Sequence, residues 1–512
     1  MKRILDSVHG YISIPKFYMN EIVDTPQFQR LRRIEQTSCR ALFPSARHDR
    51  FIHSLGVFHV GSLIVDWLWE KGLQNEISNG DKLLDERKLS VLITYRLACL
   101  LHDVGHTPFS HTFEDYFING TNQLPQKLSS YIPEDKDFLS DFISQFTKKD
   151  GKLRYAAHEL ISAIVALHYF RDTVILSDKN SYKGFAAKGN PSLLVRMIVG
   201  CKYLKEGYSY EDSFIELMHG DVIDADGVDY VCRDVWASGY STAKVDLKRL
   251  IRSIVLYNSG NDNYQLCYDA KIINEIKSVL QIKAFQNDII FNHHIIALEQ
   301  HVLQEALMDA AIYHTQTKIN KNDNLEDVRS DALKKLCNID MYIGKNGYRL
   351  KSGTIINQPM DDDFISIMKS TDPKEEQFIS QWFQRKFKWC PLWKTREAFY
   401  ADIPEKLRAD ITENVESTWI FSYLAKKCIE RIFGISAKDI LILSTLDKDK
   451  LLEINKINVI VENKVFPYSS IFPEVESRTL PYFKYIFIPT SYKDRIQDIR
   501  KCLIQNWDKA LS

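Results

Sequence analysis

The sequence predicts a mainly α-helical protein that consists of a helical bundle and a smaller C-terminal α+β lobe. Two observations lead to this fold class. Along most of the first 340 residues, apolar side chains recur at steps of three and four, which is the spacing of one helix face. After residue 340, short apolar runs typical of strands appear. We therefore predict a core at 1–340 and a lobe at 341–512 with a role in oligomerisation or regulation.

The individual elements follow from local patterns. A hairpin is expected over residues 4–14, because residue character alternates there around Gly10. Apolar periodicity predicts helices at 26–34, 53–71, 88–101, 158–169 and 271–312. Between about 116 and 155 the sequence is polar and contains Asn-Gly and Lys-Lys-Asp-Gly, which indicates an insertion or mobile loop. In the lobe, we expect strands at 440–443, 459–461 and 485–489, and a closing helix at 491–507.

Composition narrows the class of protein. Lys plus Arg and Asp plus Glu both total 67, so no charge excess indicates a membrane or nucleic acid as partner, although nucleic acid is not excluded. The nine cysteines form no CxxC pair, which favours reduced thiols and a cytoplasmic location. The start lacks the apolar core of a signal peptide, and the most apolar stretch noted, 90–101, is shorter than the ~20 residues of a membrane span.

An adjacent pair, His102 and Asp103, is the first candidate for metal binding. Neighbouring side chains on a helix diverge by about 100°, so both reach one ion only at the end or edge of the helix, and other helices must supply further ligands. His53 and Asp226 suit this role, because apolar residues flank each of them. Imidazole and carboxylate together suit Zn, Fe, Mn or Ni. A chance His-Asp pair is the alternative, but residues 100–114 hold three histidines and two carboxylates.

Three other aspartates near Asp226 are alternative metal ligands. Asp221, Asp224 and Asp229 lie nearby, and a helix-capping role is the alternative for Asp226 itself. Its register with Tyr230 favours Asp226 as the ligand.

The motif set resembles a known family. Arg50, His53, His102-Asp103 and Asp226 resemble the metal-binding signature of HD-domain phosphohydrolases. Longer stretches are similar to the deoxynucleoside triphosphate (dNTP) triphosphohydrolases, namely 24–32, 43–44, 50–57, 102–111, and Asp229-Tyr230 with Arg233-Asp234. The resemblance covers about the first 300 residues and resumes at 370–373. The vertebrate member carries a sterile alpha motif before its HD domain, and we expect no such domain here.

The resemblance implies an activity and an assembly. A dNTP would be cleaved at the α-phosphate to give the nucleoside and inorganic triphosphate. The HD-type core would hold one divalent transition metal (Mn, Fe, Zn or Ni) at His53, His102, Asp103 and Asp226, and Mg or Mn would accompany the triphosphate. Such a metal neutralises the phosphate and lowers the pKa of water. The family also implies a homo-oligomer, by analogy a tetramer.

The same resemblance assigns catalytic residues. His106, His111, His158 and Glu159 match positions around the scissile phosphate, where an imidazolium stabilises charge and protonates the departing 5′ oxygen. We assign the general-acid role to His111. The alternative for each histidine is a hydrogen-bonded core residue.

Substrate contacts are implied at five further positions. Arg50 lies one helical turn before His53 and would contact phosphate oxygens, with a surface salt bridge as the alternative. Gln36 and Asp234 would bind the sugar 3′-hydroxyl, and Tyr230 would pack beneath the deoxyribose. Lys283 falls near positions that line the base and phosphates.

The chain departs from the family at Gly227, where vertebrate members have lysine, so one triphosphate contact must come from elsewhere or be lost. Asn287 and Phe291 also differ from the family's histidine and tyrosine.

A regulatory site is suggested by analogy alone. Asp24, Gln29 and Arg32 match residues that bind an activating guanine nucleotide at a subunit interface. Asp246 and Arg249 resemble a second half of such a site, with plain helix-surface charge pairing as the equal alternative.

Two other functions share the four metal ligands. The first is an HD-type phosphodiesterase or nuclease, against which Gln36, Tyr230 and Asp234 argue. The second is a catalytically weak dNTP-binding sensor, which Gly227 and Phe291 suggest. Whether a triphosphohydrolase would serve dNTP pool control or dNTP depletion against phage is left open by the sequence.

Overall fold

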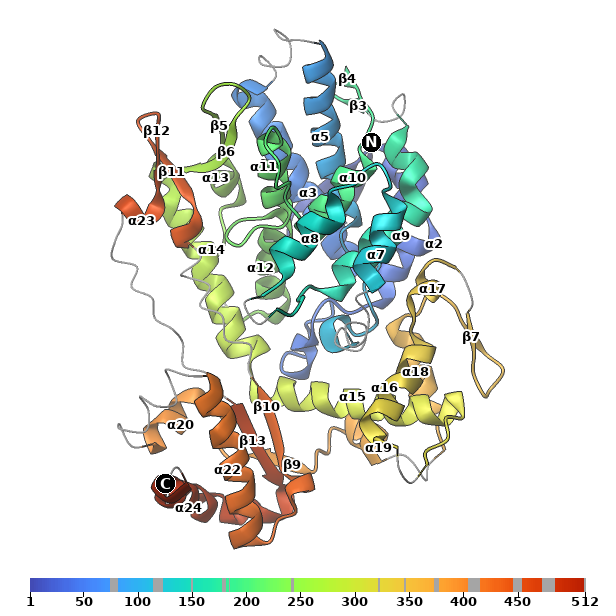
Figure 1. Cartoon of the computed structure of the whole chain (residues 1–512), viewed down its shortest axis with the longest axis vertical. Coiled ribbons are helices and arrows are strands. Elements are labelled where there is room, and N and C mark those ends of the chain that lie inside the picture. Colours follow the sequence, from blue (N-terminus) through green and yellow to red (C-terminus); the bar gives the residue numbers. More distant parts are fainter. Residues whose placement is uncertain are drawn as a thin grey trace.

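The mainly α-helical class is confirmed by the computed structural model (Figure 1). The structure describes residues 1–73, 82–113, 123–148, 151–176, 181–183, 185–240, 244–320, 323–344, 347–372, 377–403, 415–444, 454–471 and 484–510. A helical core lies at one end of the molecule, and a smaller lobe built on β9, β10 and β13 lies at the other (Figure 1).

The core begins with the predicted hairpin. Strands β1 (Lys2–Asp6) and β2 (Gly10–Ile14) pair antiparallel. The chain then passes through α1 (Lys16–Tyr18), α2 (Pro26–Gln29) and two 3₁₀ turns, η2 (Arg30–Arg33) and η3 (Ser38–Ala41). These short elements bring Gln36 and Arg50 to the start of the first long helix.

Long helices with buried apolar faces form the centre of the core. The Asp49 side chain caps the first of them by accepting a hydrogen bond from Ile52 N at 2.9 Å. The helices are α3 (Arg50–Leu68), α5 (Lys82–Leu101), α9 (Ala157–Ile175), α10 (Pro191–Val199), α11 (Ser209–Met218), α12 (Ala225–Ser238), α13 (Leu247–Arg252) and α14 (Ile273–Gln286). The α3 helix and the turn after it, Arg50–Lys71, are long and apolar enough to span a membrane, but the apolar window is 67% buried inside the protein, as in a core helix.

The segment at 116–155 differs from the expected loop. In its described part it forms α7 (Gln123–Tyr131) and α8 (Phe138–Phe146), and residues 114–122 and 149–150 lie outside the described residues. Phe138 and Phe142 are fully buried and Phe142 stacks on Phe146, so aromatic residues four positions apart stabilise α8 in spite of its polar neighbours.

The single helix predicted at 271–312 is wrong. The structure has α14, a π-helical turn η7 (Asn287–Phe291) and a separate helix α15 (His294–Thr315). The break falls at residues 292–293, where the His293 side chain accepts a hydrogen bond from Ile295 N and so caps the new helix. Periodicity continues across this break because both helices bury apolar faces, and it therefore hid the change of direction.

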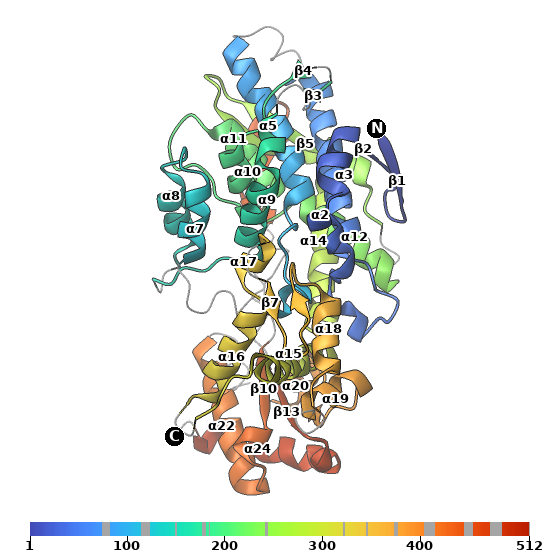
Figure 2. The same cartoon turned by 90° about the vertical axis from the view of Figure 1, so that its right-hand side faces the viewer.

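Helices between core and lobe follow α15 (Figure 2). They are α16 (Leu325–Leu336), α17 (Ile339–Tyr342), α18 (Asp361–Lys369) and α19 (Gln377–Gln384), with a small hairpin of β7 (Tyr348–Arg349) and β8 (Ile355–Ile356). Met341, Tyr342 and Ile367 are buried in the same cluster as the core helices. The division at residue 340 stays a prediction, and buried packing crosses it.

The C-terminal lobe contains the predicted strands at 440–443 and 485–489. An antiparallel sheet of order β10-β13-β9 is formed by β9 (Trp389–Pro391), β10 (Leu441–Ser444) and β13 (Lys484–Pro489). Three helices accompany it, α20 (Arg396–Asp402), α22 (Val415–Phe433) and α24 (Ile496–Ala510). Leu298 and Val302 of α15 are buried in this lobe's own core cluster, so α15 joins the two parts.

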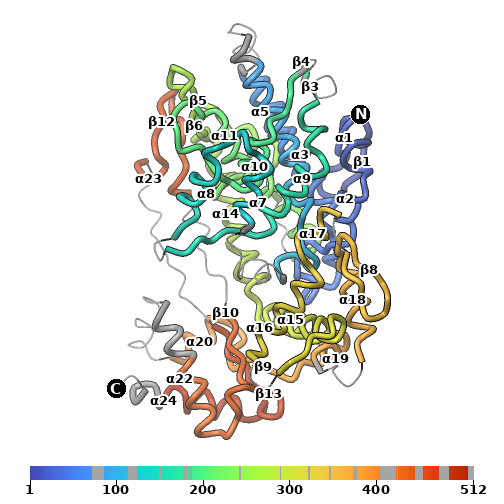
Figure 3. Tube along the Cα trace, turned by 45° about the vertical axis from the view of Figure 1, so that its right-hand side comes forward, coloured from blue at the N-terminus to red at the C-terminus, as the bar shows by residue number. Residues whose placement is uncertain are grey.

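The strand expected at 459–461 exists, but it joins a sheet of the core. β11 (Asn458–Val461) pairs parallel with β6 (Tyr264–Asp269) in a sheet of order β12-β11-β6-β5, with β12 (Lys464–Pro467) and β5 (Ile254–Asn258) at its edges. The orange and green strands lie side by side in Figures 1 and 3. Two further strands, β3 (Ser181–Tyr182) and β4 (Phe185–Ala186), form a separate hairpin.

Candidate metal centre and catalytic loop

The four predicted metal ligands come from three parts of the fold and converge. His53 lies in the first turns of α3, His102 and Asp103 directly follow α5, and Asp226 lies in the first turn of α12. His53 Nε2 is 2.9 Å from Asp226 Oδ1, 3.3 Å from His102 Nε2 and 3.8 Å from Asp103 Oδ2. His102 and Asp103 thus lie at the end of a helix, one of the two places where adjacent side chains were predicted to reach one ion.

These residues fit a divalent metal. Ligand atoms that each lie about 2.1 Å from one ion are about 3 to 4 Å from each other, and the separations found are of this size. Two imidazoles and two carboxylates are the donor set of Zn, Fe, Mn or Ni sites. The Asp226 side chain is 39% exposed, while His53 and Asp103 are buried, so the centre is open on one side, as in catalytic sites.

Protonation of the ligands depends on their neighbours. Burial lowers the pKa of His102, which keeps this imidazole neutral and able to bind a metal. Burial also disfavours the charged form of His53, but hydrogen bonds with Asp226 and Asp229 raise its pKa to about 10. A metal therefore has to displace a proton from His53. Burial opposes ionisation of Asp103, yet the Arg50 guanidinium holds the pKa of Asp103 well below its usual value.

A buried network behind the metal centre was not predicted from the sequence. Asp229 accepts from His53 Nδ1 at 2.7 Å, is hydrogen-bonded to His9 Nε2 at 2.6 Å, and accepts two hydrogen bonds from Arg233 at 2.9 Å. Arg233 also binds Asp6 at the end of β1. Asp229 and Arg233 lie four residues apart on a buried helix face, and this charged pair was the available signal. The network fixes the orientation of the His53 ring.

Arg50 is a buried residue, so its surface salt-bridge alternative is wrong. The Arg50 side chain is 3% exposed and donates from Nη1 to Asp103 Oδ2 at 2.5 Å. Its Nε donates to Ser110 Oγ at 2.9 Å, and its Nη2 donates to the Gln36 carbonyl at 3.3 Å. Since a guanidinium has five N–H groups, donors remain for a phosphate. Arg50 thus joins Asp103 to the loop that carries His106 and His111.

Three predicted catalytic histidines form a second cluster. The rings of His106 and His158 stack with centroids 4.5 Å apart, and His111 lies 5.2 Å and 5.1 Å from them. Their ligand atoms all lie within 4.8 Å of one another, so the cluster is also able to hold a metal ion. Burial and the Arg50 charge hold the pKa of His106 well below its usual value, and this ring is therefore neutral at pH 7. Glu159 lies 3.7 Å from His219 Nδ1, a residue that the sequence analysis did not consider.

The two residues expected to bind the sugar 3′-hydroxyl, Gln36 and Asp234, carry buried oxygen atoms without a hydrogen-bond partner among the described residues. These atoms are Gln36 Oε1 and Asp234 Oδ2. The other Asp234 oxygen is hydrogen-bonded to His48 Nε2 at 2.7 Å, and the His48 carbonyl accepts from Gln36 N at 3.0 Å. A buried acceptor without a partner is costly, so these atoms favour a polar ligand. His48, which links the two residues, was missed at the sequence level.

Lys283 of α14 lies in the space that a side chain at residue 227 would take. A Cβ atom on Gly227 would lie 2.5 Å from Lys283 Nζ and 2.8 Å from Asp224 Oδ1. The buried ammonium donates to the Val222 carbonyl at 3.3 Å and lies 5.5 Å from the centroid of the Tyr230 ring. The glycine that departs from the family pattern thus leaves room for a cation from another helix.

The five residues predicted for regulation lie in two places. Near α2, Arg32 donates to Gln29 Oε1 at 2.9 Å, and Asp24 lies 3.6 Å from Lys2 Nζ. At α13, the Asp246 side chain accepts from Arg249 N at 3.1 Å. Arg249 also pairs with Glu275 at 3.2 Å. Asp246 lines a cavity of about 870 Å³ that also reaches His9.

Comparison with protein families agrees with this geometry. Residues 50–176, which include His53, His102, Asp103 and the three-histidine cluster, match the HD domain family model. The chain is 43% identical over 119 residues to deoxynucleoside triphosphate triphosphohydrolase SAMHD1 of Bos taurus, which is 23% of this chain and 18% of that protein. It is 26% identical over 327 residues to the SAMHD1 homolog of Dictyostelium discoideum, which is 64% of this chain and 52% of that protein. The matched part of the chain thus spans about half of one relative and less than a fifth of the other.

The fold is shared with a solved structure. A phosphohydrolase from Bacteroides thetaiotaomicron superposes with a TM-score of 0.59 at 20% identity, over 96% of this chain and 100% of that chain. The chain therefore carries an HD domain and is related to dNTP triphosphohydrolases, as its motifs indicated.

Proposed function

We propose that this HD-domain protein is a metal-dependent triphosphohydrolase that converts a dNTP into its nucleoside and inorganic triphosphate. The observation that carries the proposal is that one loop contributes side chains to two neighbouring clusters. His102 belongs to a group with His53 and Asp226 that could hold a metal, with Asp103 Oδ2 3.7 Å from His102 Nε2, and His106 and His111 belong to the three-histidine cluster. A phosphate held between them would face a metal on one side and imidazoles on the other.

Different residues of this chain would bind the metal, bind the phosphate and transfer the proton. When bound at His53, His102, Asp103 and Asp226, a divalent metal supplies Lewis-acid chemistry that polarises a phosphoryl group and activates water. Arg50 would bind phosphate oxygens with its remaining donors. Since His106 is neutral, it is unsuited to donate the proton, and His111 is the residue that we assign to protonate the departing 5′ oxygen.

Recognition of a deoxy sugar is the finer part of the proposal. A sugar hydroxyl has one hydrogen and would donate it to one of these two acceptors, the Gln36 or the Asp234 oxygen. Tyr230 lies one helical turn before Asp234 on α12 and would pack against the sugar face. We also propose a cytoplasmic location, because the nine cysteines form no CxxC pair. By analogy with the family, we propose a homo-oligomer that a nucleotide bound at Asp24, Gln29 and Arg32 activates.

The test is a matrix of substrates and metals. Purified protein is incubated with each dNTP and with Mn²⁺ or Mg²⁺, alone and with a second nucleotide as activator. Chromatography is expected to resolve equimolar nucleoside and inorganic triphosphate. If no combination yields triphosphate, the proposal fails. Release of nucleoside monophosphates from an oligonucleotide would instead identify a nuclease, and nucleotide-dependent oligomerisation without any turnover would identify a sensor.

Replacement of Lys283 by methionine is expected to raise the KM for the dNTP about 10-fold, with a smaller change in kcat. The reason is that Lys283 would supply one charge to the triphosphate, and loss of a hydrogen bond to a charged group costs about 1.5 kcal/mol or more. Steady-state kinetics with the preferred dNTP measures this effect. Lys271→Met, which removes an exposed lysine just before the same helix, is the matched control. Equal KM values for Lys283→Met and wild type would remove Lys283 from the substrate site.

A further inference from the structure

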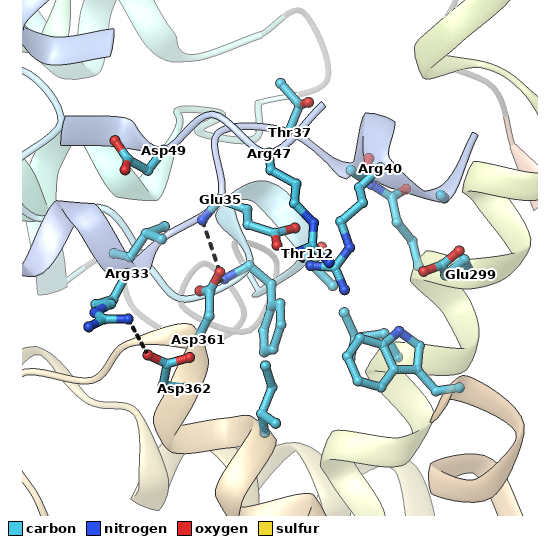
Figure 4. Close-up of a pocket in the computed structure, with 18 of the residues that line it drawn as sticks. Arg33, Glu35, Thr37, Arg40, Arg47, Asp49, Thr112, Glu299, Asp361 and Asp362 are labelled. Atoms are coloured by element: carbon cyan, nitrogen blue, oxygen red, sulfur yellow. Dashed lines mark hydrogen bonds and ion pairs between the residues drawn. The ribbon is translucent and has the colours of Figure 1, made fainter. Parts of the chain in front are cut away.

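One carboxylate from the segment before the lobe binds two loops of the candidate active site. Asp361, the first residue of α18, accepts from Glu35 N at 2.9 Å through Oδ2 and from Phe109 N at 2.6 Å through Oδ1. The Asp361 side chain is 5% exposed. Figure 4 shows the hydrogen bond to Glu35 in the wall of a cavity of about 400 Å³.

Both loops carry predicted active-site residues. Glu35 directly precedes Gln36, and Phe109 lies between His106 and His111. A shift of either loop would therefore move a residue proposed to contact the substrate. Each oxygen of the Asp361 carboxyl group accepts one of these hydrogen bonds, so a single buried side chain is able to fix both positions.

The catalytic loop needs such support because its backbone is strained. Phe109 and Ser110 have φ angles of +53° and +54°, a region that residues other than glycine rarely adopt. Two consecutive residues of this kind persist only when surrounding contacts hold them. Thr107 Oγ1 donates to the Ser110 carbonyl at 2.8 Å, and Ser110 Oγ donates to the Glu35 carbonyl. Asp361 supplies the contact to the amide of Phe109 itself.

A second residue ties the same segment to the same loop. Arg30 is buried and donates from Nε to the Pro359 carbonyl at 3.0 Å. Its two terminal nitrogens donate to the Val104 carbonyl, at 3.3 Å, and to the His106 carbonyl. Residues 359–361 are thus held against residues 104–109 on both sides, once through the Arg30 guanidinium and once through the Asp361 carboxyl group.

We propose that Asp361 is a positioning residue for the proposed reaction. Asp361 sets the conformation of the loop that carries His106 and His111, and it sets the distance between this loop and Gln36. The inference rests on the proposed function. The Asp361 carboxyl group binds the backbone of residues 35 and 109, and it would act on the neighbouring site residues through that backbone. Asp361, which lies 252 positions after Phe109 in the chain, would in this way help to hold the active-site loop of the HD domain in place.

The test replaces Asp361 by asparagine, which keeps the shape of the side chain and one acceptor. The second acceptor becomes an N–H₂ group that faces a backbone N–H. We expect kcat to fall roughly 10- to 100-fold, because small displacements of catalytic groups have effects of this size. The KM and the metal content are expected to stay within about threefold of wild type. Hydrogen–deuterium exchange in peptides covering 104–113 is expected to be faster by about 10-fold or more, since the Phe109 amide loses its acceptor.

Asp362→Asn is the matched control. Asp362 is the next residue, has a side chain 63% exposed, and pairs at 3.5 Å with Arg33, an interaction also drawn in Figure 4. It is expected to behave as wild type in kcat and in exchange. The inference is overturned if Asp361→Asn matches Asp362→Asn in either kcat or exchange. The inference is also overturned if Asp361→Asn changes kcat, KM and metal content together and lowers the melting temperature. That result would indicate a purely structural role. A wild-type protein without triphosphohydrolase activity would contradict the proposed function, while unchanged exchange at 104–113 in Asp361→Asn would contradict the positioning role independently.

Discussion

Replacement of His102 by alanine is expected to reduce the release of inorganic triphosphate by at least about 1,000-fold, since a bound metal contributes several kcal/mol to such a reaction. His102 Nε2 lies 3.3 Å from His53 Nε2 and 3.7 Å from both Asp103 and Asp226, so its loss leaves a gap in the ligand set. Metal content by mass spectrometry is expected to fall together with activity. The fold should persist, because the imidazole lies beyond the end of α5 rather than inside it.

His168→Ala is the control for this substitution. His168 is an exposed histidine on α9, remote in sequence from each predicted ligand. Chelation followed by addition of Mn²⁺ should restore activity in wild type and in His168→Ala, but not in His102→Ala. Retention of both metal and activity in His102→Ala would show that the other three residues suffice, and the four-ligand centre would then be incorrect.

The convergence of His53, His102, Asp103 and Asp226 was predictable because each lies in a local motif with its own context. His102 and Asp103 are adjacent, and their position at the end of a helix follows from the requirement that both reach one ion. The apolar residues around His53 and Asp226 indicated helices, and the structure has α3 and α12 there. Short-range patterns of this kind also predicted the first hairpin and strands at 440–443 and 485–489, which the structure has at 441–444 and 484–489.

Contacts between distant residues were not predictable from such patterns. Asp229 binds His53 across 176 positions, and Asp361 binds the Phe109 amide across 252 positions. Nothing in either local sequence specifies the partner, because a hydrogen bond needs only a donor and an acceptor brought together by the fold. The same reason explains why β11, read as a strand of the lobe, pairs with β6 of the core. The two helices at 273–286 and 294–315 were merged because periodicity carries no information on direction.

Replacement of Asp229 by asparagine is expected to weaken metal binding roughly 10- to 100-fold, the usual cost of losing a partner behind a metal ligand. The asparagine would keep the shape of the side chain but lose the charge that faces His53, His9 and Arg233. Burial disfavours the carboxylate, yet Arg233 and the two histidines hold the pKa of Asp229 well below its usual value. The carboxylate therefore stabilises the fold above about pH 4, and this contribution is lost only as the pH falls below that value.

The same substitution is expected to lower the free energy of unfolding at pH 7 by about 3 kcal/mol, because it leaves the buried Arg233 charge with Asp6 as its remaining anion. Urea unfolding and metal titration measure the two effects. Asp221→Asn, which removes an exposed pair with Lys456, should change neither. Gly56→Ala tests the network without changing its charges, since a Cβ atom there would lie 1.9 Å from Asp229 Oδ1. If Gly56→Ala weakens metal binding as Asp229→Asn does, the position of the carboxylate matters as well as its charge. If Asp229→Asn binds metal as wild type does, the prediction is wrong, and the His53 ring is held by the metal centre alone.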